Sequence, residues 1–209
     1  IAEPPGRVVP VGVTLGVVLT LAARFLVMSL TSLTVDIEPR SLLISLAIGL
    51  LGAMILVVLD RVTNMLLFPA IARSPGGPSF LRKLLLVNAA YLGAMLLIFL
   101  SSLALPHYWM LLLGPQYKAQ EPYLWMAIGA YVLTSASGFA FRTLAGRGAT
   151  TRQWITIPLV IAVQVAFVAG VGVGSLPQVL AFNLATSFTH FAFQYGLVLL
   201  RIPEWRTAR

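Results

Sequence analysis

The fold of this chain is decided by the stretch at residues 82–106, which reads RKLLLVNAAYLGAMLLIFLSSLALP. Two adjacent cations, Arg82 and Lys83, precede an apolar run that ends at Pro106. Crossing the hydrocarbon core of a bilayer takes about 20 residues, and the run at residues 84–105 has this length without a charged side chain. The pattern therefore predicts a membrane-spanning helix that stops at the proline.

Five further apolar runs accompany this one. The six predicted spans cover about residues 9–33, 41–72, 84–105, 123–144, 154–173 and 176–200. The chain is 59% hydrophobic and 10% charged, with a mean hydropathy of +0.93, whereas globular proteins have about 25% charged residues. We therefore predict an all-α fold, a polytopic transmembrane helical bundle with six spanning helices in a single domain, residues 1–209. The apolar part of residues 107–122 is too short to span, and we expect a short interfacial or re-entrant segment on the external side.

The Lys and Arg residues alternate in density between successive loops. Ten of the fourteen precede the first span or flank the cytoplasmic ends of the later ones: Arg7, Arg73, Arg82, Lys83, Arg142, Arg147, Arg152, Arg201, Arg206 and Arg209. The loops of opposite parity hold only Arg40 and Lys118. Because cytoplasmic loops retain Lys and Arg, the pattern predicts that both termini are cytoplasmic. It also accounts for the net charge of +8 without a nucleic-acid partner, and the partners we expect are membrane lipids.

Charged side chains inside apolar runs are the first candidates for a functional site. Arg24 lies well inside the first run, and Asp60 and Arg61 interrupt the second. Asn64 shares a helical face with Asp60 because the two are four residues apart. A charge at mid-helix costs about 2.5 to 3.5 kcal/mol on insertion scales, so such residues usually face a bundle interior or a wet cavity. A structural ion pair or snorkelling to the interface is the alternative, above all for Arg61.

The last run carries a polar stripe. Asn183, Ser187, His190 and Gln194 follow one another at helical spacing on an otherwise apolar segment. Such a stripe either forms hydrogen bonds to neighbouring helices or lines a water-filled path. His190 would serve a proton relay only with a nearby acidic partner, and the sequence offers none beside it.

The loop at residues 74–79 and the proline before it are candidate bend points. Pro69 lies in the last third of the second run, and Gly76 and Gly77 stand between prolines. The chain contains no cysteine, so disulfides and Cys-ligated metals are excluded. No cluster of metal ligands, no catalytic carboxylate pair and no phosphate-binding glycine loop is present in the sequence. We therefore predict no enzyme activity, no catalytic residues, no metal and no cofactor.

Two segments resemble a known family. The first is Leu66-Leu67-Phe68-Pro69-Ala70-Ile71-Ala72-Arg73, preceded by Leu59-Asp60-Arg61-Val62. The second begins with Leu113-Gly114-Pro115-Gln116-Tyr117, continues through Glu121-Pro122-Tyr123-Leu124 and ends with Leu144-Ala145-Gly146-Arg147-Gly148. Over about residues 41–152 the chain resembles polysaccharide and lipid-linked oligosaccharide flippases of the multidrug/oligosaccharidyl-lipid/polysaccharide exporter superfamily.

The resemblance implies a function and a location. Members have two lobes around a central cavity, and this chain would match the C-terminal lobe. The implied substrate is an undecaprenyl-pyrophosphate-linked polysaccharide repeat unit, moved across the bacterial cytoplasmic membrane during polysaccharide or lipopolysaccharide biosynthesis. The implied partner is a missing N-terminal lobe or a second copy of the chain. Because the chain starts at Ile1, we expect it to be the C-terminal half of a longer protein.

Three alternatives stay open at this point. A multidrug or ion-coupled exporter of the same superfamily would need buried carboxylates, and Asp60 is the single acidic group within a run. A membrane glycosyltransferase or ligase would need catalytic groups in an external loop. The longest external segment offers His107, Lys118 and Glu121. The last alternative is a scaffold protein of a polysaccharide assembly complex.

Overall fold

The computed structural model describes Pro69, residues 76–113 and residues 115–207, and every element within them is helical. In chain order the elements are α4 (Pro78–Ala104), α5 (Pro106–Leu113), the 3-10 helix η2 (Pro115–Tyr123), α6 (Leu124–Gly146), the 3-10 helix η3 (Gln153–Ile155), α7 (Thr156–Gly170) and α8 (Leu176–Thr207). The predicted all-α fold is confirmed for this part of the chain. The predicted spans at 9–33 and 41–72 lie outside it, apart from Pro69.

Three of the described helical segments are long and apolar enough to cross a membrane. They are Pro78–Ala104, Tyr117–Gly146 and Gln153–Gly170, which indicates a membrane protein. Helix α8 has 32 residues but is not one of the three, because polar side chains recur along it. A helix of this kind is better placed inside a bundle than against lipid.

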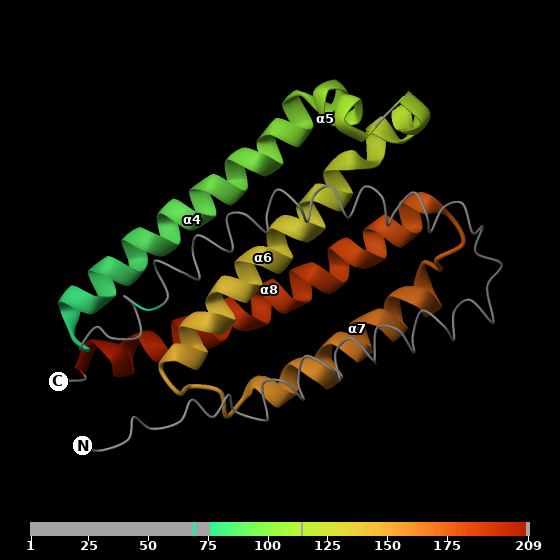
Figure 1. The fold of residues 1–209 in the computed structure, drawn as a ribbon. Coiled ribbons are helices and arrows are strands. Elements are labelled where there is room, and N and C mark those ends of the chain that lie inside the picture. The colour runs from blue at the N-terminus through green and yellow to red at the C-terminus, as the bar shows by residue number, and fades with distance from the viewer. Residues whose placement is uncertain (1–68, 70–75, 114, 208–209) are drawn as a thin grey trace, which may run out of the picture.

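Helix α8 occupies the middle of the described bundle. It packs most extensively on α6 and also contacts α7 and α4, and Figure 1 shows it between α6 and α7. The largest apolar cluster joins α4, α6 and α8, and within it the rings of Tyr91 and Phe139 stack with centroids 4.7 Å apart. The burial of α8 on three sides explains how it tolerates polar residues.

The ends of two helices follow from local sequence. Pro106 lacks a backbone N–H and begins α5 directly after α4 ends at Ala104. Helix α6 ends at Gly146, and Gly148 adopts a φ of 68°, a left-handed conformation that favours glycine. The N–H of Gly148 donates to the carbonyl of Ala145 and that of Ala149 to Leu144. These two bonds satisfy carbonyls that the helix end would leave unpaired.

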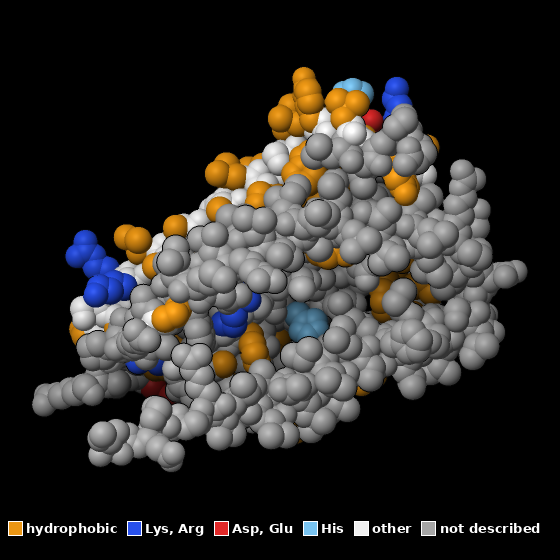
Figure 2. Space-filling model, viewed as in Figure 1, with side chains coloured by type: hydrophobic (Ala, Val, Ile, Leu, Met, Phe, Trp, Pro, Cys, Tyr) orange, Lys and Arg blue, Asp and Glu red, His pale blue; other side chains and the backbone are white. Residues whose placement is uncertain are grey.

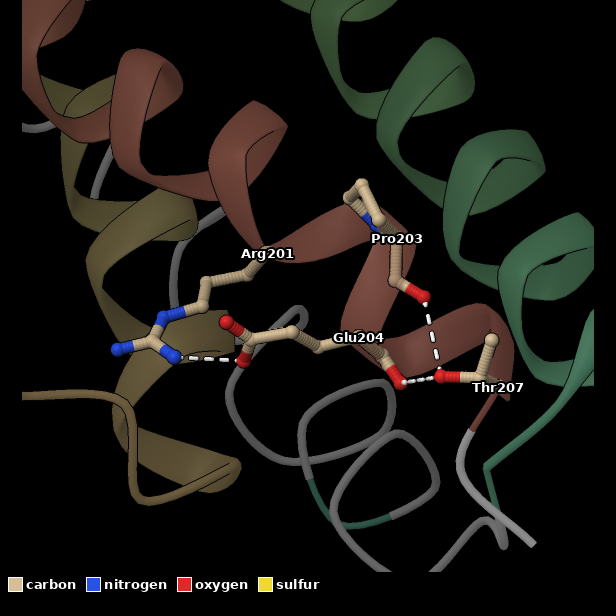
Figure 3. Close-up of polar contacts among 4 residues, drawn as sticks. All are labelled: Arg201, Pro203, Glu204 and Thr207. Carbon is tan, nitrogen blue, oxygen red and sulfur yellow. Dashed lines mark hydrogen bonds and ion pairs between the residues drawn. The ribbon is translucent and has the colours of Figure 1, made fainter.

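Helix α8 continues seven residues past Leu200, where we expected the last span to end, and stops at Thr207. Pro203 lies within this extension. Arg201 forms an ion pair with Glu204, and the Thr207 hydroxyl donates to the carbonyls of Pro203 and Glu204 (Figure 3). These local contacts hold the extra turns together. The predicted span at 176–200 followed the apolar run, and the helix extends beyond that run through these contacts.

The basic side chains of the described residues gather at one end of the bundle. This end is formed by the start of α4, the end of α6, η3 and the end of α8 (Figure 1). It holds Arg82, Lys83, Arg142, Arg147, Arg152, Arg201 and Arg206, whereas Lys118 lies in η2 at the opposite end. Charges that are dispersed along the sequence therefore come together in space.

Candidate functional site

The polar stripe of α8 is the candidate site that the structure describes best. Ser187 and Gln194 are buried, at 3% and 5% exposure, while Asn183 and His190 are half-buried. The Ser187 hydroxyl oxygen accepts a hydrogen bond from Thr134 of α6 at 3.0 Å. The stripe therefore contacts α6 along its middle.

The C-terminal end of the stripe contacts a different element. Gln194 and Gln153 of η3 exchange two hydrogen bonds between their side-chain amides, at 2.7 and 3.0 Å. Each amide donates through Nε2 and accepts through Oε1, so one donor and one acceptor of both side chains are satisfied. Ser187 and Gln194 thus form hydrogen bonds to neighbouring helices, which is one of the two roles that the stripe allowed.

A third polar contact joins α8 to α4. The Tyr195 hydroxyl donates to Oδ1 of Asn88 at 2.9 Å. Helix α8 is thereby hydrogen-bonded through side chains to α4, to α6 and to the start of the α7 segment. Bonds of this kind between membrane helices contribute about 0.6 kcal/mol on average. Together they bind the described helices into one unit around α8.

The remaining candidates are distributed as follows. Arg24, Asp60, Arg61 and Asn64 lie outside the described residues. Of the predicted bend points, Pro69 and Gly76 are half-buried, and Gly77 is buried with a φ of 105° immediately before α4. Figure 2 shows basic side chains and a histidine in the middle of the face it presents.

Helix α7 carries a buried polar group that the sequence analysis did not single out. Gln164 is 0% exposed, and neither its Nε2 nor its Oε1 has a hydrogen-bond partner among the residues that the structure describes. Val160 and Thr156 precede it at intervals of four residues and are also buried, so the three share one face of α7. Near the end of α7, the rings of Phe167 and Phe182 meet with centroids 5.8 Å apart. Gln164 therefore lies about one turn from this contact with α8.

Comparisons with protein-family models, with curated proteins and with solved structures find no match to this chain. Within the described ranges, no three His, Asp or Glu side chains come close enough together to hold a metal ion. The polar contacts of α8 are the features of this part of the molecule from which a site is built.

Several contributing residues were missed from the sequence. Three of them are hydrogen-bond partners of α8 side chains, namely Asn88, Thr134 and Gln153. The fourth is Tyr195, which lies on α8 and donates to Asn88. Their signal is present, since each is a polar residue in or beside an apolar run. Which polar residue meets which other one depends on helix packing, and no spacing rule within one helix specifies it.

The Gln153–Gln194 pair makes a direct test of this arrangement. Gln153→Met and Gln194→Met should each lower the thermal unfolding midpoint, because each change leaves the opposite amide without its partner. The double variant should be more stable than the sum of the two effects, with a coupling energy of about 0.6 to 1.7 kcal/mol. Thermal unfolding of the four proteins in detergent measures this coupling. Strictly additive effects would show that the two amides do not interact.

Proposed function

We propose that this chain forms one lobe of a transporter that moves an undecaprenyl-pyrophosphate-linked glycan across the bacterial cytoplasmic membrane. The observation that carries the proposal is the order of the two family-like segments. The second segment begins at Leu113, at the junction of α5 and η2, and ends in the Gly-Arg-Gly turn that closes α6 at Gly148. A short helical piece leading into an apolar helix with a glycine turn is the arrangement that the resemblance implies.

The hydrogen bonds of α8 support a role as one lobe of a two-lobe transporter. Alternating access requires a body that moves as a unit against another around a shared site. Tyr195, Ser187 and Gln194 connect α8 to three neighbouring elements, which favours such a unit. The second body would be an N-terminal lobe or a second copy of the chain.

The gathering of cations at one end supports the proposed orientation. Cytoplasmic segments retain Lys and Arg, so this end would face the cytoplasm, with α5 and η2 at the external side. Six spans with both termini inside the cell complete the proposed topology. The glycan-lipid would enter the cavity from the cytoplasmic leaflet, with its pyrophosphate group inside the cavity.

The cavity has a defined physical task. It must shelter a polar, anionic headgroup from hydrocarbon while the lipid tail stays in the bilayer. Arg24 and Arg61 are the proposed cations that attract the pyrophosphate, and Asp60, Asn64, Asn183, His190 and Gln194 are proposed cavity residues. Gln194 already exchanges two hydrogen bonds with Gln153, which leaves fewer of its polar groups for a substrate.

The two arginines give the sharpest functional prediction. Arg24→Ala and Arg61→Ala in the full-length protein should each abolish glycan export, because a cavity without these cations no longer attracts the pyrophosphate. Surface polysaccharide is the readout, and membrane abundance of each variant is the control for folding. Wild-type export by both variants would remove these residues from the site.

The transport function itself is tested by deleting the gene in its native host. Surface polysaccharide should disappear while the lipid-linked repeat unit accumulates inside the cell, and the full-length gene supplied in trans should restore both. A deletion strain with normal surface polysaccharide would contradict the proposed function. Loss of polysaccharide without accumulation of the lipid-linked unit would indicate an earlier biosynthetic step and would also contradict it.

A further inference from the structure

A backbone hydrogen bond and an aromatic contact connect the end of α8 to the beginning of α4. The backbone N–H of Gly77 donates to the carbonyl of Trp205 at 3.0 Å. The Trp205 and Phe80 rings meet edge to face with centroids 6.2 Å apart, and both side chains are buried. Figure 1 shows this junction at the basic end of the bundle, and Figure 3 shows the last turns of α8 beside α4.

Among the residues that the structure describes, positive charge outnumbers negative charge at this junction. Arg82 in the second turn of α4 and Arg206 in the last turn of α8 both have exposed side chains. The Arg147 guanidinium lies 3.6 Å above the Phe80 ring, and burial lowers its pKa. Among the described residues, Glu204 is the acidic side chain at this end, and it is paired with Arg201. The junction therefore favours an anion.

An apolar recess begins next to the junction. It lies between α4 and α8 with residues of α6 as its floor, and its volume of about 30 Å³ is the room that one water molecule takes. Leu81 and Leu85 line the α4 side, and Val198 and Ile202 line the α8 side. Leu85 is 56% exposed, so this wall reaches the outer surface of the bundle. The hydrogen bond between Tyr195 and Asn88 marks the end of the recess away from the junction.

The two exposed arginines do not line the recess, but their sequence positions place them near its junction end. Arg82 lies between Leu81 and Leu85 in sequence, and Arg206 follows Ile202 by four residues, one helical turn later on the same face. The exposed apolar surface of Leu85, close in sequence to a cation at the end of the bundle, matches the chemistry of an anionic amphiphile. Zwitterionic lipids lack the net charge that the two arginines would neutralise.

We propose that the junction and recess form a binding site for an anionic phospholipid, called here the α4–α8 lipid site. The phosphate lies between Arg82 and Arg206, and one acyl chain lies along Leu85, Val198 and Ile202. The bound lipid covers the seam between α4 and α8 and joins the start of α4 to the end of α8. The site requires a membrane location, and it does not depend on the transport of a glycan.

Native mass spectrometry of the full-length protein tests the site. The protein in detergent is titrated with phosphatidylglycerol and, separately, with phosphatidylcholine of the same acyl chains. We expect retained phosphatidylglycerol adducts, and an affinity loss on the order of tenfold in the Arg82→Gln/Arg206→Gln double variant. Lys83→Gln/Arg152→Gln is the matched control, because it removes the same charge from exposed side chains at the same end, away from the recess.

Three results would overturn the proposal. Equal losses in the two double variants would show a diffuse electrostatic effect. Equal retention of phosphatidylcholine and phosphatidylglycerol by the unmodified protein would show that charge does not select the lipid. Undecaprenyl phosphate that binds in a manner sensitive to Arg82→Gln/Arg206→Gln, while phosphatidylglycerol does not bind, would assign the recess to a polyprenyl chain instead. Helix content by circular dichroism verifies that both double variants are folded.

Discussion

Gln164→Met is expected to raise the thermal unfolding midpoint of the protein, whereas the same substitution at Gln194 is expected to lower it. Both glutamines are buried, at 0% and 5% exposure. They differ in their partners, because Gln194 exchanges two hydrogen bonds with Gln153, while both amide atoms of Gln164 have none within the described part of the chain. The unfolding midpoint is therefore expected to change in opposite directions in the two variants because of this difference in hydrogen bonding alone.

The expected sizes come from the cost of burying polar groups. A buried donor or acceptor without a partner costs about 1 to 3 kcal/mol, and Met removes that cost at Gln164 while filling a similar volume. The two residues have similar helix propensities, so the backbone contributes little. At Gln194, Met removes a pair of hydrogen bonds and strands the amide of Gln153, with an expected loss of about 0.6 to 1.7 kcal/mol.

Thermal unfolding in detergent, followed by circular dichroism, measures both changes. Gln164→Ala is a useful third variant, because it removes the amide but leaves a cavity. The cost of the cavity should offset the stability that is gained by removing the unpaired amide. A midpoint below wild type for Gln164→Met would contradict the assignment of an unpaired amide. A gain in stability for Gln194→Met would contradict the contribution of the Gln153–Gln194 pair.

Gly129→Leu is expected to disrupt the contact between three helices. Gly129 lies on α6, and a Cβ atom built there would stand 3.1 Å from the Phe99 ring of α4 and 3.3 Å from Leu184 of α8. A leucine places further carbons in the same space, so α4 and α8 would both have to move away from α6. Overpacking of this kind typically costs about 1 to 3 kcal/mol and occasionally more. Small residues permit this close approach of membrane helices.

Gly93→Leu is the matched control. Gly93 is also a helical glycine, on α4, but nothing lies within 4 Å of a Cβ atom built there. Replacing a helical glycine by leucine removes a backbone penalty of about 1 kcal/mol, so this variant should unfold at or above the wild-type midpoint. Equal midpoints for the two leucine variants would show that α6 does not pack closely at Gly129.

Much of the secondary structure was predictable because it is local. Pro106 separates α4 from α5, and Gly148 closes α6, through properties of single residues. Helix α8 extends beyond the predicted span at 176–200, because Trp205 and Thr207 continue the helix after the apolar run has finished. Trp205 is buried against Phe80, and that contact connects residues far apart in the sequence.

The candidate site was predictable in part. The spacing of Ser187 and Gln194 placed them on one face of a helix, and the structure brings both into hydrogen bonds with neighbouring helices. Gln164 was not predicted as a site residue from the sequence, since a single glutamine in an apolar run forms no periodic pattern. Its burial without a partner is a property of the α7 surroundings and not of the α7 sequence.

Composition and hydropathy alone determined that the described part of this chain is helical and suited to a membrane, because these properties depend on how each segment interacts with its solvent. The spacing of the Lys and Arg residues along the chain was also evident from the sequence. Antiparallel packing of the helices brings these residues together at one end of the bundle. Tertiary structure alone decided the partners: Gln153 for Gln194, Asn88 for Tyr195, and Trp205 for Phe80. Such pairs depend on helix rotation and crossing, which are set by side-chain packing across distant segments.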